Sequence, residues 1–140
     1  MNEIPSAKPL KIVLDLLKND PFSQWMGIKI EEAGEGFVRI SCKVTANMLN
    51  GFKVAHGGII FSLADTALAF AAATSGQPSL ALDHSISFTR KVESGEELTA
   101  TAKKVNLTRK TGLYIAEVRN SSGEINAVLK GTVYRPASKN

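Results

Sequence analysis

The 140-residue sequence has few of the residues that disulfide-rich, metal-binding or nucleotide-binding proteins need. Its one cysteine, Cys42, has no partner for a disulfide or for a zinc site within this sequence. Its two histidines, His56 and His84, are too far apart in the chain for a metal-ligand motif, so we expect no bound metal. No glycine-rich loop of the nucleotide-binding type is present.

Long apolar runs and a strong excess of charge are also missing. The best candidate for a membrane span, Ile59–Ala73, is too short and has Asp65 near its centre. The first residues show no basic segment followed by an apolar one, so we expect no signal peptide. The net charge of +4 permits an anionic ligand, but no basic face with interleaved aromatic residues indicates nucleic acid. We therefore expect a cytoplasmic protein without membrane or nucleic-acid partners.

The composition predicts one globular domain over residues 1–140. Its 44% of apolar and 21% of charged residues are ordinary values for a soluble domain of this length. A short amphipathic helix is expected over residues 8–18, and a polar tail over residues 135–140. The apolar stripe of that helix consists of Leu10, Val13, Leu14 and Leu17.

Strand patterns fill most of the remaining chain. One strand is expected to begin at Ile28, after a connection over residues 22–27. A half-buried strand is expected over residues 37–45, with Cys42 on its inner face. The four strands expected at the end of the chain have short connections, which predict an antiparallel meander over residues 79–90, 97–107, 113–120 and 124–134. In the first of these, one face is expected to carry Leu80, Leu82, His84, Ile86 and Phe88, with His84 as a satisfied core or interface histidine.

A long apolar helix is expected from Gly57 to about Ser75, buried on most sides. The predicted fold class is therefore α+β, with an antiparallel sheet of about six strands curled around one long central helix. Between Val54 and Leu82 the only formal charge belongs to Asp65. An ionised carboxylate is costly to bury unless it is paired, so Asp65 is either well compensated or used in chemistry.

Three motifs together resemble the hotdog-fold acyl-CoA thioesterases, in particular the phenylacetate-degradation (PaaI-type) branch. They are Met48–Gly51, the sequence His56-Gly57-Gly58, and Phe61–Thr66 with its aspartate. Ile86–Arg90 and Lys110–Gly112 extend the likeness over nearly the whole chain. The resemblance implies hydrolysis of acyl-CoA thioesters with a small, medium or aryl-acetyl acyl group. It implies no cofactor apart from the CoA of the substrate, and a homodimer that often pairs into a dimer of dimers.

The same motifs supply candidate catalytic residues. The first turn of a helix has unpaired N–H groups, and the resemblance assigns the oxyanion donor to Gly57. Asp65 is either the general base for water or the nucleophile. His56 lies beside the thioester carbonyl or orients the preceding loop, and Asn50 holds that loop or bonds the thioester region. Thr66 bonds Asp65 or the attacking water.

The spacing of two of these residues predicts an assembly. Gly57 and Asp65 are eight residues apart on one helix, which is roughly 12 Å along its axis. One thioester carbon cannot contact both groups at that separation. If both act, they come from two copies of the chain whose helices run antiparallel about a two-fold axis.

Substrate contacts are assigned to basic and apolar side chains. The candidate contacts for the CoA phosphates are Arg90, Lys91, Arg109 and Lys110. The candidate lining of an acyl pocket is Trp25, Met26, Leu49 and Phe61. Much of the family has Ser or Thr on the third strand where this chain has Ala81, so Ser85 or Thr66 would have to replace that hydroxyl.

Two other functions are compatible with the sequence. A hotdog dehydratase would use a histidine and an acid for proton transfer. A non-catalytic acyl-CoA-binding or regulatory hotdog protein would keep the fold without the chemistry. The position of Asp65 deep in the helix, after His-Gly-Gly, favours hydrolysis over dehydration by analogy. The presence of Asp65 also argues against a binding protein, which has no need for a lone carboxylate beside the carbonyl.

Overall fold

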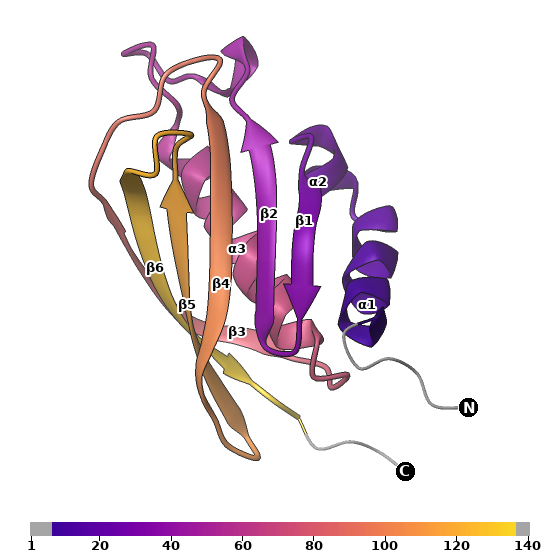
Figure 1. Cartoon of the computed structure of the whole chain (residues 1–140). Coiled ribbons are helices and arrows are strands. Elements are labelled where there is room, and N and C mark those ends of the chain that lie inside the picture. The colour runs from indigo at the N-terminus through magenta and orange to yellow at the C-terminus, as the bar shows by residue number, and fades with distance from the viewer. Residues whose placement is uncertain (1–6, 137–140) are drawn as a thin grey trace.

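A six-stranded antiparallel sheet and one long helix across its face dominate the computed structural model, which describes residues 7–136 (Figure 1). The helices are α1 (Ala7–Lys18), α2 (Pro21–Trp25) and α3 (Gly57–Ala73), with a short 3-10 turn, η1 (Ala46–Met48). The strands are β1 (Lys29–Gly34), β2 (Phe37–Lys43), β3 (Leu80–Phe88), β4 (Glu97–Leu107), β5 (Thr111–Arg119) and β6 (Ile125–Tyr134). The expected α+β architecture is confirmed.

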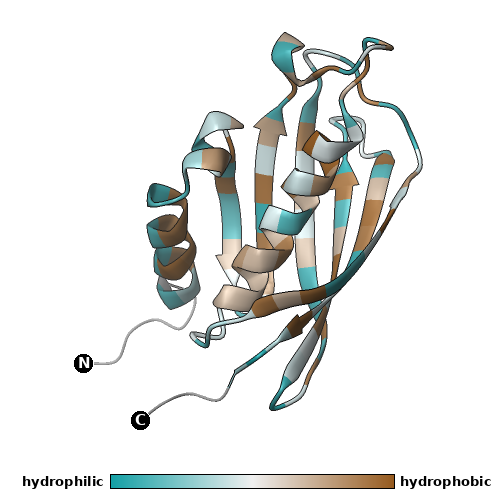
Figure 2. Cartoon of the chain, turned by 180° about the vertical axis from the view of Figure 1, so that it is seen from behind, coloured by the Kyte–Doolittle hydropathy of each residue, from teal (hydrophilic) through white to brown (hydrophobic). Residues whose placement is uncertain are grey.

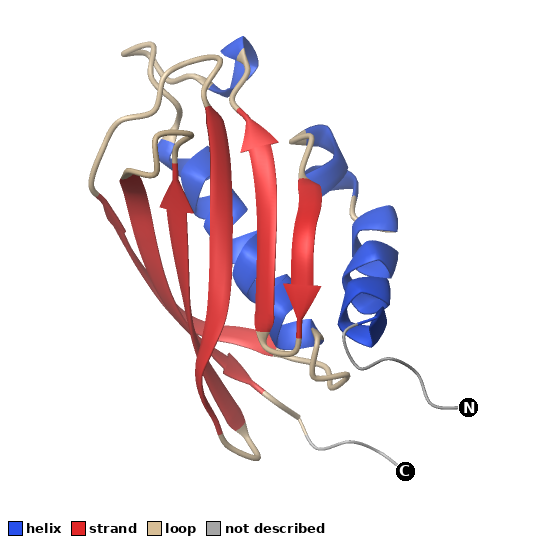
Figure 3. Ribbon diagram, in the orientation of Figure 1, coloured by secondary structure: helices blue, strands red, loops and turns tan. Residues whose placement is uncertain are grey.

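The core lies between α3 and the concave face of the sheet (Figure 3). The alternation predicted for β2 is confirmed, because Val38, Ile40 and Cys42 are almost completely buried. Leu63 and Ala67 of α3 are fully buried against the sheet. The Cys42 thiol donates to the Met26 carbonyl oxygen at 3.1 Å, and burial raises the pKa of this thiol to about 11.

The strand order is β1-β2-β4-β5-β6-β3, which corrects the predicted meander of four strands. Strands β4, β5 and β6 do form a meander, but β3 pairs with β6 at the edge of the sheet. The connection over residues 89–96 is long enough to cross the end of the sheet. It is held there because the Thr89 N–H donates to Asn126 O at 2.8 Å and the Gly95 N–H donates to Val44 O at 2.8 Å.

The inner face of β3 also differs from the prediction. The register shifts between Ala81 and Asp83, so one extra residue interrupts the alternation at Leu82. Ala81 and His84 consequently lie on the helix side, whereas Leu80 does not share that face. Leu80 and Leu82 are 61% and 59% exposed at this sheet edge.

Helix α3 is less enclosed than expected. The sheet covers one side of it, and Figure 2 shows the other side uncovered. Gly58 and Ala69 are exposed on that open side, and the Asp65 side chain is 42% exposed. A sheet with a single helix on its inner face can cover that helix from one side only, so the open side is available to another molecule. None of the helices in residues 7–136 is both long and apolar enough to cross a membrane.

The ends of the chain contain three further differences. Residues 22–25 of the expected connection over residues 22–27 form α2 together with Pro21, and the N-cap Asp20 accepts from the Ser23 N–H at 3.0 Å. In α1, Val13 is buried, but Leu10 and Leu14 of the predicted stripe are exposed. Arg135, expected in a frayed tail, donates to Gln77 Oε1 at 2.8 Å, and the rest of that tail after Pro136 lies outside the described residues.

Candidate active site

Helix α3 begins at Gly57, and His56 is its N-cap. The His56 Nδ1 atom accepts a hydrogen bond from the Gly58 N–H at 2.9 Å. In the part of the chain that the structure describes, the Gly57 N–H has no acceptor. The histidine therefore caps the helix and leaves the neighbouring N–H group, at the positive end of the helix dipole, available to a ligand.

A pocket of about 350 Å³ opens beside Gly57. It is lined by Ala55, Gly57, Ile60, Phe88, Thr89, Arg90, Lys91 and Val92. A Cβ atom on Gly57 would lie 3.4 Å from the Phe88 ring, which is an ordinary contact. The pocket thus combines an unpaired N–H, an aromatic wall and two cationic side chains at its rim.

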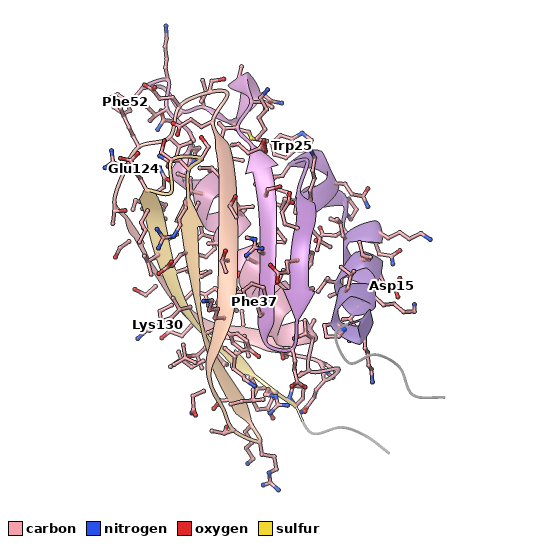
Figure 4. All side chains as sticks on the ribbon, in the orientation of Figure 1. Asp15, Trp25, Phe37, Phe52, Glu124 and Lys130 are labelled. Carbon is pink, nitrogen blue, oxygen red and sulfur yellow. The ribbon has the colours of Figure 1, made fainter. Side chains whose placement is uncertain are left out.

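The Asn50 side chain organises the loop that leads into α3. Its Oδ1 atom accepts from the Phe52 N–H at 2.9 Å and from the Val54 N–H at 3.3 Å. Lys53 within this loop has a positive φ of 64°. Phe52, 89% exposed, lies at the outer end of the loop (Figure 4). These contacts show that the Asn50 Oδ1 atom holds this loop.

Asp65 is paired with a residue to which sequence reasoning gave no role at the site. The His84 Nε2 atom lies 2.9 Å from Asp65 Oδ1, and the His84 side chain is only 9% exposed. Within the described residues, Thr66 makes no hydrogen bond to Asp65. The available signal was Gly131, a glycine inside a strand pattern, which often marks a close approach of another group. In the register of β3 and β6, Gly131 stands opposite His84.

A single chain does not bring Gly57 and Asp65 together. Both lie on α3, two turns apart, and their separation is roughly 12 Å along the axis. Gly57 faces its pocket at the helix N-terminus, whereas Asp65 lies on β3's side of the open helix face.

The four basic residues fall into two separate groups. Arg90 and Lys91 lie at the rim of the Gly57 pocket, where each also pairs with a glutamate, Glu124 at 3.2 Å and Glu93 at 3.7 Å. Arg109 and Lys110 are in the turn between β4 and β5, at the opposite end of the sheet (Figure 1). Within one protomer these two groups therefore do not face the same ligand.

The acyl-pocket candidates are also divided. Trp25 and Met26 line a pocket of about 390 Å³ together with Met48, away from Gly57. Phe61 instead lies against the His84 ring, with a centroid separation of 6.3 Å. Ser85, a suggested replacement for the missing hydroxyl, alternates with His84 and points to the outer face of β3, so it does not approach Asp65 in this chain.

Both the sequence and the fold of this chain are similar to those of known proteins. Residues 52–127 match the family described as the thioesterase superfamily. The acyl-coenzyme A thioesterase PaaI of Escherichia coli is 38% identical over 120 residues, which are 86% of each chain. The solved structure of E. coli PaaI, from the phenylacetic acid degradation operon, superimposes with a TM-score of 0.94 at 35% identity and covers 97% of this chain and 99% of that one.

A second solved structure gives the same result. A variant of the phenylacetic acid degradation protein PaaI from Thermus thermophilus has a TM-score of 0.81 at 36% identity, covering 84% of this chain and 100% of that chain. The expected hotdog fold is thereby confirmed, since the sheet and the central helix coincide with those of these proteins.

Proposed function

Because this chain belongs to the thioesterase superfamily and is an acyl-CoA thioesterase of the PaaI type, we propose that it hydrolyses small, medium or aryl-acetyl CoA thioesters at sites shared by two protomers. The observation that carries the proposal is the unpaired Gly57 N–H at the mouth of a pocket, combined with Asp65 two turns further along the same helix. Gly57 can supply the oxyanion donor for thioester hydrolysis, and Asp65 can supply the base or nucleophile.

Gly57 is the oxyanion donor in this proposal. Attack on a thioester carbonyl places negative charge on its oxygen, and a preoriented N–H at a helix N-terminus stabilises that charge. His56 acts indirectly, because its cap to Gly58 fixes the first turn of α3. Asn50 acts indirectly as well, through the loop that its Oδ1 atom holds.

Asp65 supplies the other half of the reaction. As a general base it takes a proton from water, which attacks the carbonyl carbon; the C–S bond then breaks and CoA leaves as a thiolate that takes up this proton. As a nucleophile it displaces the CoA thiolate to form an anhydride, which water then cleaves to the free acid and the regenerated carboxylate. Its partial exposure on the open face of α3 leaves room for a substrate that is bound at Gly57 of a second protomer. The Thr66 hydroxyl, next in sequence, is available to hold the attacking water.

The shared site explains how the two groups reach one thioester. The open face of α3 carries small residues, Gly58, Ser62 and Ala69, around Asp65, so a second helix can approach closely. Two antiparallel helices place Gly57 of each protomer opposite Asp65 of the other. The candidate phosphate contacts lie at the two ends of one sheet, Arg90 with Lys91 at one end and Arg109 with Lys110 at the other. Both pairs can therefore bind the same CoA only if they come from different protomers. A dimer of dimers is the larger assembly that we propose.

A thiol-release assay over a panel of acyl-CoAs tests this function. We expect turnover without added metal, and we expect Asp65→Asn to lower kcat by at least about 100-fold, the scale of losing a positioned base. Binding of substrate should survive, because the amide keeps the shape of the carboxylate. Near-wild-type turnover in Asp65→Asn would reject the role of Asp65, and acyl-CoA binding without any thiol release by the wild-type protein would favour a binding protein instead.

A further inference from the structure

A hydrogen bond between His84 and Asp65 joins the edge strand β3 to the central helix. The two partners are His84 Nε2 and Asp65 Oδ1, 2.9 Å apart. No second hydrogen-bond partner of the Asp65 carboxylate is found among residues 7–136. The histidine is nearly buried while the carboxylate is partly exposed, so the bond anchors one carboxylate oxygen and leaves the other free.

The imidazole of His84 occupies a space that the fold keeps open for it. Phe61, one turn before Asp65 on α3, lies against the ring at a tilt of 43°. On the neighbouring strand, a Cβ atom at Gly131 would lie 2.7 Å from both Cε1 and Nδ1 of His84. No side chain larger than hydrogen fits there without displacing the ring. The bulge at Leu82 sets the alternation that turns His84 toward the helix.

The surroundings of the ring identify the nitrogen that carries a proton. His84 Nδ1 lies 2.8 Å from the Asp83 carbonyl oxygen, and Nε2 faces the Asp65 carboxylate. Both neighbours are acceptors. A neutral ring protonated only on Nδ1 would direct the Nε2 lone pair at a carboxylate, whereas protonation of Nε2 gives a charge-assisted hydrogen bond. The bond therefore runs from His84 Nε2–H to Asp65 Oδ1.

From this geometry we infer that His84 is a positioning residue for Asp65. Its Nε2–H holds Oδ1, so that Oδ2 is directed toward the reacting thioester or its water. This inference rests on the proposed role of Asp65 in the reaction. On the inner face of β3, Ala81 has no polar group, and His84 is the β3 residue that reaches the carboxylate.

The kinetic test compares His84→Met, which removes the N–H, with His84→Gln, which keeps an amide N–H at similar reach. We expect kcat to fall about 10-fold in His84→Met, the scale of a lost hydrogen bond to a charged group, with KM unchanged. His84→Gln should recover to within about threefold of wild type. Adding His84→Met to Asp65→Asn should lower kcat no further, because the histidine acts through the carboxylate. Ser85→Ala, on the outer face of the same strand, is the matched control and should behave as wild type.

Two outcomes would overturn the inference and leave the proposed function standing, provided that Asp65→Asn has lost its activity. One is an equal loss of kcat in His84→Met and His84→Gln, and the other is wild-type kcat in His84→Met. Near-wild-type turnover in Asp65→Asn would instead reject the proposed function, and the inference with it. Imidazole ¹⁵N NMR spectra of the wild-type protein show which ring nitrogens are protonated, and this test does not depend on the folding of any variant. The chain has two histidines, and we expect a protonated Nε2 on His84 and an unprotonated Nδ1 on His56. An unprotonated His84 Nε2 at the assay pH would overturn the assignment.

Discussion

Gly57→Pro removes the proposed oxyanion donor while leaving the helix start intact. Proline has no N–H, and the first position of a helix tolerates it well. The residue before a proline must be extended, and His56 already is, with φ −61° and ψ 137°. The Gly57 N–H has no acceptor among the described residues, so the substitution breaks no hydrogen bond there.

The expected loss of kcat is that of removing one N–H donor from an oxyanion hole. Loss of a single oxyanion-hole donor lowers kcat by about 10²–10³, equivalent to roughly 2.7–4 kcal/mol of transition-state stabilisation. Gly57→Ala is the matched control, because it adds a Cβ at ordinary contact distance from Phe88 and keeps the N–H. We therefore expect Gly57→Pro to fall about 10²–10³ below Gly57→Ala in kcat.

The assay is steady-state thiol release with each variant at saturating acyl-CoA, together with thermal unfolding to verify that both variants fold. If Gly57→Pro melts like Gly57→Ala and turns over within about threefold of it, the N–H of residue 57 does not stabilise the transition state. The oxyanion donor would then have to be sought elsewhere.

Two more predictions concern stability. The folded state keeps Cys42 protonated up to a pKa of about 11, against 9.0 for a free thiol, so the stability present below pH 9 should be lost progressively toward pH 11. At 1.36 kcal/mol per pKa unit the loss is roughly 3 kcal/mol. It is measured as the difference in unfolding free energy between wild type and Cys42→Ala against pH, and parallel curves would contradict it. His56→Ala should cost about 1 kcal/mol in urea denaturation by removing the cap of α3, and His56→Asn should restore most of it. Equal stability of wild type and His56→Ala would show that the cap contributes nothing.

Patterns that depend on local periodicity predicted the fold well. The alternation in β2 gave the right strand with the right buried face, and the long apolar run gave the right helix, although α3 is open on the side that was expected to be covered. The order of the strands needed information that local patterns do not contain. A connection such as residues 89–96 permits either pairing with the next strand or a crossing of the sheet, and long-range hydrogen bonds decide between them. The helix α2 was missed although Asp20 and Pro21 form a cap and first turn that favour it.

The sequence predicted the motifs of the candidate site, but it did not predict the contact between His84 and Asp65. Gly57 and His56 lie where a helix start requires them, which sequence spacing alone indicates. The contact of His84 with Asp65 depends on the bulge at Leu82, because one extra residue decides which side chains of β3 face the helix. A bulge leaves no clear mark in a single sequence, and only Gly131 pointed to the space that the imidazole fills.

The shared active site is the central claim, and mixing two inactive variants tests it most directly. Gly57→Pro lacks the donor and Asp65→Asn lacks the base, so each homodimer should be nearly inactive. A mixed dimer contains one site with both changes and one intact site. Random pairing makes half of the dimers mixed, so co-refolding should restore up to about a quarter of wild-type activity, provided that transition-state stabilisation is local to each site. If native mass spectrometry shows mixed dimers but no activity returns, Gly57 and Asp65 of different protomers do not act on the same thioester.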